Sequence, residues 1–136
     1  MMKLSLLIGL ALLAAFLWVR LAPSDPARWH QLPDPEPAPR GPGHVLARLE
    51  AQAGEMAALD AIIRDTARTQ VLAGSLEAGM ITYVTRSTWW GFPDYTTLAR
   101  RGDDLVLYAR LRFGASDFGV NAARVGDWRG RLGQGG

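Results

Sequence analysis

The chain has 136 residues, which suits one domain, and it contains no cysteine. Disulfides, thiolate zinc sites, iron–sulfur clusters and thiol nucleophiles are therefore excluded. The formal charge is only +2, from fifteen Lys and Arg against thirteen Asp and Glu, so we expect no nucleic-acid partner. The sequence also lacks a P-loop, a dinucleotide-binding glycine pattern and metal-ligand spacings, so we predict no cofactor and no metal.

The N-terminus carries an uninterrupted run of uncharged, mostly apolar residues at 4–19, between Lys3 and Arg20. As a helix this run spans about 24 Å, and two more apolar residues extend it because the side chain of Arg20 can reach the headgroups. We predict a membrane anchor over residues 1–22, with residues 4–22 in contact with the membrane. We therefore expect a membrane as the partner of this segment, and we expect the chain to cross it once.

A cleaved signal peptide is the alternative interpretation of residues 1–22. Cutting after Ala22 would place Arg20 where a small residue is needed, and cutting after Ala15 would place Leu13 there. The uncleaved anchor is therefore favoured. A short N-terminal tail inside and the domain outside is the usual orientation, which predicts a bacterial inner-membrane protein with a periplasmic domain.

A Pro-rich segment at residues 23–42 follows, with seven of the eight prolines of the chain. This density disfavours helix and is typical of an extended, semi-rigid linker. Trp29 and Leu32 are its sizeable apolar side chains, and they either pin the segment to the domain or lie at the membrane surface. His30 has no partner at metal-ligand spacing, so we assign it no role.

Residues 43–132 are predicted to form one α+β domain, followed by a flexible tail at 133–136. Residues 44–49 are compatible with a short strand or an extra turn. Apolar side chains at helical spacing predict a helix over 55–67, and a second helix is expected over 117–132. Between them, β-branched and aromatic runs separated by turn signals predict four strands, at 69–73, 80–86, 95–101 and 104–113. Their short connections favour a small antiparallel sheet of about four strands, with both helices packed on one face.

The last predicted strand shows the clearest alternation. Leu105, Leu107 and Ala109 fall on one face, whereas Arg110 and Arg112 fall on the other. The apolar face is expected to take the helices. The opposite face is expected to stay open and to be lined by arginine, the cation that suits carboxylates and phosphates.

The second predicted helix has an apolar stripe with a polar residue inside it. Phe118, Val125, Trp128 and Leu132 form the stripe, and Asn121 falls between its members. A buried Asn must find hydrogen-bond partners or cost on the order of 1–3 kcal/mol. We expect the backbone of a tight loop to supply them.

Two stretches break the expected patterns, RSTWWGFPDY at 86–95 and RLRFGASDFGVNAARVGDW at 110–128. The first stretch is preceded by TYVT at 82–85. Over these residues and the second stretch, the sequence resembles the DUF1499 family of uncharacterised bacterial envelope and plastid proteins. The resemblance implies a small domain behind an N-terminal membrane segment. It implies no established activity, cofactor or catalytic residue.

The polar residues of these stretches have a structural interpretation and a functional one. Structurally, Asp94 caps a turn and Asp117 caps a helix, and arginines satisfy both carboxylates. Functionally, an anion-binding cleft receives a phosphate or carboxylate. The candidate ligand-binding residues are Arg86, Asp94, Arg110, Arg112, Asp117, Asn121 and Arg124.

Three functions follow as hypotheses. The first is a noncatalytic envelope module that binds an envelope protein or an anionic small molecule through the arginine-lined face. The alternative is a small hydrolase or transferase that uses Asp94 and Asp117 as an acid–base pair, which requires the two carboxylates to lie close together. The third is a second membrane contact through Trp89 and Trp90.

Overall fold

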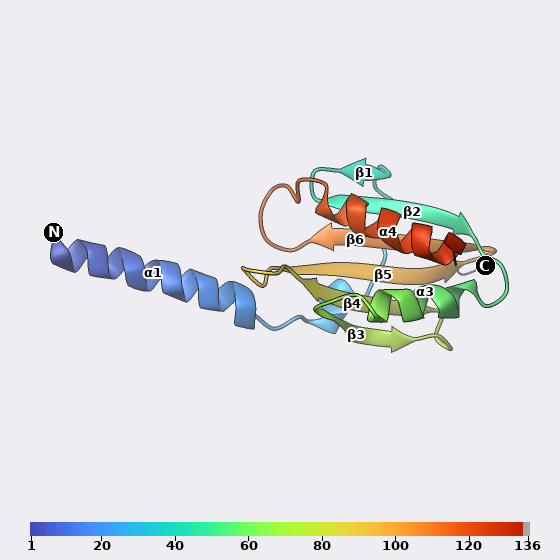
Figure 1. Ribbon diagram of the computed structural model, residues 1–136, viewed down its shortest axis with the longest axis horizontal. Coiled ribbons are helices and arrows are strands. Elements are labelled where there is room, and N and C mark those ends of the chain that lie inside the picture. Colours follow the sequence, from blue (N-terminus) through green and yellow to red (C-terminus); the bar gives the residue numbers. More distant parts are fainter. Residues whose placement is uncertain (135–136) are drawn as a thin grey trace.

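The computed structural model describes residues 1–134. A long N-terminal helix projects from one end of a compact α+β body (Figure 1). This helix, α1, covers Met2–Leu21 and buries none of its residues. Its 20 residues correspond to about 30 Å, and its mean hydropathy of 2.3 makes it long and apolar enough to cross a membrane.

The body is built on a sheet of six strands, which is two more than the sequence predicted. In sheet order these are β1 (Arg40–Gly41), β2 (His44–Glu50), β6 (Asp104–Leu111), β5 (Pro93–Arg101), β4 (Met80–Arg86) and β3 (Thr69–Ser75). Every neighbouring pair is antiparallel. The prediction missed β1 and left β2 open because β2 pairs with β6, some 60 residues later, and no local signal encodes that pairing.

Two helices pack side by side on one sheet face, as predicted (Figure 1). They are α3 (Glu55–Arg64) and α4 (Val120–Gln134). Trp128 is fully buried between helix and sheet, and its indole N–H donates to the Thr66 hydroxyl at 2.8 Å. Burying each large apolar side chain contributes about 1.5–3 kcal/mol. The core side chains are Val45, Met56, Leu59, Ile63, Ile81, Tyr83, Leu98, Leu105, Leu107, Ala109, Val125 and Trp128.

The last helix begins three residues later than expected. Phe118 and Gly119 both have positive φ, at 53° and 81°, so the chain turns sharply before Val120. Phe118 is consequently 95% exposed and does not belong to the apolar stripe of α4, which corrects the prediction. At the other end, α4 continues through residues 133 and 134, where a flexible tail is predicted, and residues 135–136 lie outside the described part of the chain.

The Pro-rich segment folds onto the second face of the sheet. It contains a one-turn helix, α2 (Pro26–Trp29), which Asp25 caps by accepting a hydrogen bond from the backbone N–H of Ala27. The first helical position is one where proline is tolerated, because the missing N–H has no partner there. Both faces of the sheet are therefore covered over part of their area, and the sequence-based description of this segment as a spacer is incomplete.

Candidate functional site

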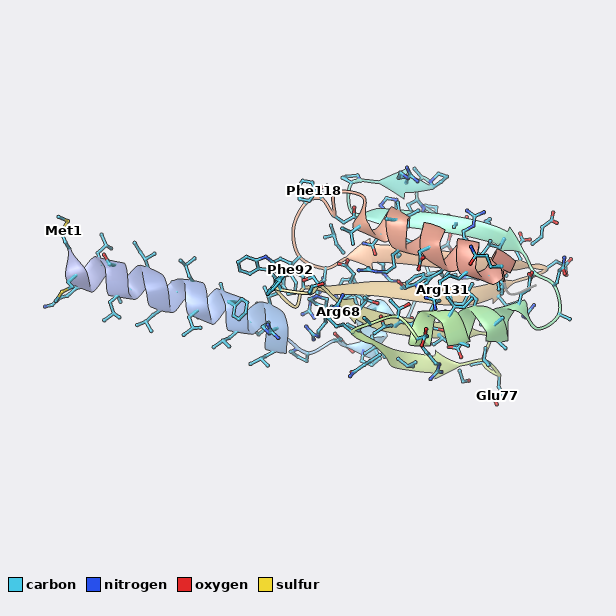
Figure 2. The ribbon with its side chains drawn as sticks, viewed as in Figure 1. Met1, Arg68, Glu77, Phe92, Phe118 and Arg131 are labelled. Carbon is cyan, nitrogen blue, oxygen red and sulfur yellow. The ribbon has the colours of Figure 1, made fainter. Side chains whose placement is uncertain are left out.

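Two loops meet at the end of the body that faces α1. One joins β4 to β5 (residues 87–92), and the other joins β6 to α4 (residues 112–119). Phe92 and Phe118 both lie at this end (Figure 2). Trp89 and Trp90 are also exposed, at 84% and 60%, and the Trp90 ring lies 6.1 Å from that of Phe16 in α1. The end nearest α1 thus presents large apolar side chains to solvent.

Behind these loops, four polar side chains form one connected cluster. The Nδ2 of Asn121 donates to Oδ2 of Asp117 at 2.9 Å and to Oδ2 of Asp94 at 3.4 Å. Nη1 of Arg124 donates to Oδ1 of Asn121 at 3.0 Å and to Oδ2 of Asp94 at 3.3 Å. Asn121 is fully buried. Its partners are side chains from both motifs, and not the loop backbone that the sequence suggested.

Each carboxylate also has a structural role that the sequence predicts in part. Asp117 accepts a hydrogen bond from the backbone N–H of Gly119 at 2.8 Å, so it caps the turn before α4. Asp94 lies at the start of β5, where it pairs with Thr85 and Leu111 on the two neighbouring strands. The predicted capping role is therefore correct for Asp117, and the predicted arginine partner is correct for Asp94, which pairs with Arg124.

Burial dominates the electrostatics of Asp94. It raises the pKa of this carboxyl, because the nearby Arg124 only partly offsets the loss of solvent, and the neighbouring Asp117 raises the pKa further. The ion pair between Asp94 and Arg124 is itself largely buried, with 15% of each side chain exposed. Two carboxylates, an amide and a guanidinium thus share a site in which the proton on Asp94 is held more tightly than in water.

A cavity of about 570 Å³ opens beside this cluster. Its walls are mostly apolar, and Asp94, Asp117 and Arg124 supply a charged side. Apolar walls with a few convergent polar groups are the usual character of a small-molecule site. The apolar lining comes from both loops and the adjoining strand and helix: Phe92, Leu111, Phe113, Phe118 and Val120.

The arginines of the other sheet face are not part of this cluster. Arg110 is 7% exposed, and its guanidinium donates to the Thr97 hydroxyl at 2.8 Å, to the Tyr108 carbonyl at 3.0 Å and to the Trp29 carbonyl. Burial lowers the pKa of Arg110 to about 10, so the group remains charged near neutral pH. Protein groups thus occupy several donors that an external anion would use.

Arg112 and Arg86 lie on the same face as Arg110 but have separate partners. Arg112 donates to the Pro23 carbonyl at 2.9 Å and to the Tyr95 hydroxyl at 3.0 Å. Arg86 donates to the Gly91 carbonyl at 2.8 Å. The predicted single site of seven residues is therefore divided between two faces. The Pro-rich segment covers the arginine face at Arg110 and Arg112, whereas Arg86 lines a cavity at the end of β4.

Sequence reasoning offered docking of Trp29 on the domain as one alternative, but it assigned no role on this face to Ser24 or His30. The Trp29 ring stacks on Tyr95 at 4.0 Å, and Ser24 Oγ lies 2.7 Å from the Tyr95 hydroxyl. His30 Nδ1 lies 2.8 Å from the Thr82 hydroxyl, so it has a role that the sequence did not assign. The only local signal was the presence of Trp29 in an otherwise polar, Pro-rich stretch, which is typical of an apolar side chain that docks.

The residues at the cavity limit which ligands and reactions the site could support. Within residues 1–134 no group of three His, Asp or Glu side chains is arranged to hold a metal ion. Ser87 accepts a hydrogen bond from the Phe92 backbone N–H at 2.9 Å. The groups at the cavity can bind a polar head beside an apolar body, and Asp94 can hold or release a proton there.

Comparison with known proteins gives a family and no activity. A family model described as "Protein of unknown function (DUF1499)" matches residues 19–132, and the chain belongs to this family. The match contains the Pro-rich segment, both motifs and all six strands. A search of curated proteins finds no match to the sequence.

Proposed function

We propose that this member of the DUF1499 family is a noncatalytic, membrane-anchored module of the bacterial cell envelope that binds a lipid acyl chain at the bilayer surface. The observation that carries the proposal is the position of the 570 Å³ cavity, which opens between the two loops nearest α1. The anchor places this end of the domain at the bilayer.

Three features of the loop end support this ligand. The cavity has apolar walls, which suit a hydrocarbon chain. The exposed Trp89 and Trp90 suit the headgroup region of a bilayer, where amphipathic aromatic rings are favoured. Asp94, Asn121 and Arg124 supply hydrogen-bonding groups for the polar end of the ligand.

The short N-terminal tail and the domain are proposed to lie on opposite sides of the inner membrane, which α1 crosses once, with the domain in the periplasm. The chain has no cysteine, so single cysteines report this orientation without background. Glu77→Cys, at an exposed turn far from α1, should react with an impermeant maleimide in intact spheroplasts (Figure 2). Met2→Cys, in the short tail before the apolar run, should react only after lysis. The reverse pattern would place the domain in the cytoplasm.

The ligand proposal is tested by photocrosslinking the full-length chain in nanodiscs that contain a phospholipid with a diazirine in its acyl chain. Crosslinks are expected at residues 111–120, in addition to α1. Ala115→Trp should remove the crosslinks at 111–120, because Ala115 lines the cavity and the larger ring fills it. Ala123→Trp, at an exposed position of α4 outside the cavity, is the matched control and should leave them unchanged. Crosslinks confined to α1 would reject the proposal.

A second candidate function is a hydrolase or transferase that uses Asp94 and Asp117. It is favoured by the Asn121 amide, which lies within hydrogen-bond reach of both carboxylates, and by the raised pKa of Asp94, which suits a general acid. Nitrophenyl esters, phosphates and glycosides are suitable probes for the full-length chain. Turnover that Asp94→Asn abolishes would support catalysis, and turnover that survives this substitution would reject Asp94 as the acid.

A further inference from the structure

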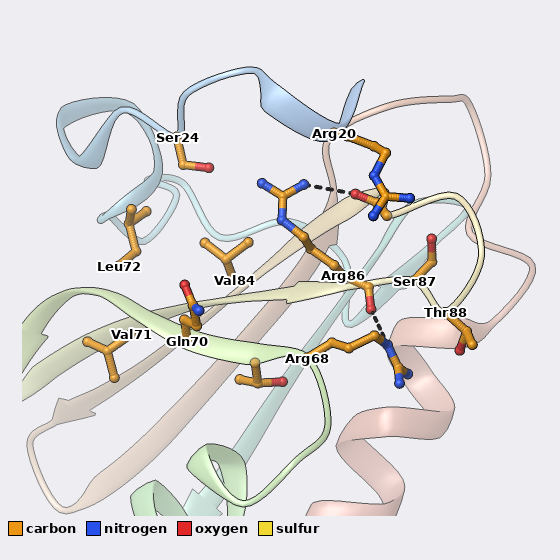
Figure 3. A pocket seen from close by; sticks show the side chains of 12 residues that line it. Arg20, Ser24, Arg68, Gln70, Val71, Leu72, Val84, Arg86, Ser87 and Thr88 are labelled. Atoms are coloured by element: carbon orange, nitrogen blue, oxygen red, sulfur yellow. Dashed lines mark hydrogen bonds between the residues drawn. The ribbon is translucent and has the colours of Figure 1, made fainter. Parts of the chain in front are cut away.

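A second cavity, of about 690 Å³, lies at the junction between the anchor and the domain. Three arginines from separate elements line it: Arg20 from the last turn of α1, Arg68 from the loop after α3, and Arg86 from the end of β4 (Figure 3). No Asp or Glu is among its lining residues. The site on the other side of the 87–92 loop, described above, does not include Arg20 or Arg68.

The three guanidinium groups have few partners of their own. Arg86 donates to the Gly91 carbonyl at 2.8 Å, and Nε of Arg68 donates to the Arg86 carbonyl at 2.9 Å. Among residues 1–134, none of the three forms a salt bridge. A guanidinium has five N–H donors, so several donors in this cavity remain for a ligand.

Local geometry holds these arginines at the cavity. Gly91 has φ of +69°, and a Cβ added there would come within 3.3 Å of the Arg20 side chain, so the loop backbone packs closely on the anchor. Arg68 has φ of 58°, a left-handed conformation that is uncommon for residues other than Gly, Asn and Asp. An arginine at a position that Gly or Asn would occupy with less strain indicates a use for its side chain.

We propose that this cavity binds a phosphate group, and that the phosphate belongs to the headgroup of an anionic phospholipid. Three arginines line this cavity with no carboxylate among them, and a phosphate there can accept charge-assisted hydrogen bonds from guanidinium groups. Ser87 and Thr88 also line the cavity and carry hydroxyl groups that suit phosphate oxygens. The choice of a lipid rests on the membrane placement proposed above, since Arg20 then lies at the level of the headgroups.

The test titrates the full-length chain, in micelles of a neutral detergent, with phosphatidylglycerol or phosphatidylcholine and counts retained lipids by native mass spectrometry. One tightly held phosphatidylglycerol is expected, with weaker retention of phosphatidylcholine, whose choline cation offsets its phosphate. The double variant Arg20→Gln with Arg68→Gln should weaken phosphatidylglycerol retention by about tenfold or more. The matched double variant Arg100→Gln with Arg101→Gln, at the far end of the sheet, should not.

Two further measurements test whether the arginines and the lipid are both required. Val71→Glu places a carboxylate at the cavity from an exposed position and should weaken retention without removing any arginine contact. Inorganic phosphate is added as a competitor: complete displacement of the lipid assigns the site to soluble phosphate, and no displacement assigns it to the lipid. Equal retention by the chain and by all three variants would overturn the proposal. Lipid retention in micelles does not depend on a bilayer, and acyl-chain crosslinking at the 570 Å³ cavity does not depend on these arginines. A negative result for one proposal therefore does not imply a negative result for the other.

Discussion

Trp29 stacks on Tyr95 with the ring centroids 4.0 Å apart and the ring planes 12° from parallel. The first residue belongs to the Pro-rich segment and the second to β5, so this contact fixes the segment to the sheet. Hydrogen bonds from Arg110 to the Trp29 carbonyl and from Arg112 to the Pro23 carbonyl strengthen the attachment. The segment between anchor and domain is therefore part of the folded body.

Replacing Trp29 by Ala should destabilise the domain by about 1–3 kcal/mol, because the stacking contact and the apolar burial are both lost. Chemical unfolding of the full-length chain in a neutral detergent, followed by circular dichroism, measures the change. Trp89→Ala is the control, and because Trp89 is 84% exposed it should stay within about 0.5 kcal/mol of the original chain. Equal effects of the two substitutions would contradict docking through Trp29.

Asn121→Leu should cost about 1–3 kcal/mol of unfolding free energy, because the carboxylates of Asp94 and Asp117 lose a buried donor and Arg124 loses an acceptor. Urea unfolding in neutral detergent measures this loss. Ala123→Ser, at an exposed position on the same helix, is expected to be nearly neutral. An Asn121→Leu chain as stable as the original would mean that the cluster contributes no net stability.

Asp94 should give the stability of the domain a specific pH dependence. Its folded-state pKa is raised above the ordinary value of 3.8, so the folded chain holds the proton more tightly than the unfolded chain. The contribution of Asp94 to the unfolding free energy is therefore largest below pH 3.8 and decreases as the pH rises through the folded-state pKa. Asp94→Asn should remove this decrease.

The measurement for Asp94 is the difference in unfolding free energy between the original chain and the Asp94→Asn variant, taken at a series of pH values from about 3 upward. The difference should change in favour of the variant as the pH rises. A difference in unfolding free energy that stays constant with pH would show that Asp94 titrates alike in the folded and unfolded chain.

Gly74 in β3 should not tolerate a side chain. Its φ is +92°, and an added Cβ would lie 2.0 Å from the Met80 carbonyl oxygen and 2.7 Å from the His30 ring. Gly102→Ala provides the comparison, because Gly102 also has positive φ but has no atom within 4 Å of the added Cβ. Thermal unfolding should show a larger loss of stability for Gly74→Ala, by about 1–3 kcal/mol. Similar losses of stability for the two variants would indicate that the positive φ alone, and not the contact of the added Cβ, causes the loss.

Much of the architecture followed from local patterns. The alternation of Leu105, Leu107 and Ala109 correctly identified the face that α3 and α4 cover, because side chains in a strand point to alternate sides. The element boundaries were less accurate, since β5 begins at Pro93 and β6 ends at Leu111, and α3 ends at Arg64. Strand and helix ends depend on pairing and turn geometry, which periodicity does not report.

The candidate site was predictable only in its parts. The sequence marked Asn121 as a polar residue that needs partners, and the capping role of Asp117 followed from its place before a helix. The contact between Asn121 and Asp94 joins residues 27 positions apart and exists only because α4 packs over β6, the strand that pairs with β5. The grouping of Arg20 with Arg86 likewise depends on where α1 meets the 87–92 loop.

The sequence by itself determined the apolar N-terminal helix, the alternating strands and the amphipathic helices, because each depends on the spacing of side chains along a short stretch. The tertiary structure alone decided that the face bearing Arg110 is covered and that the loop end beside α1 holds the cavity. Alternation tells which side of a strand a residue occupies. What packs against that side depends on contacts between distant segments, whose pairing no local spacing encodes.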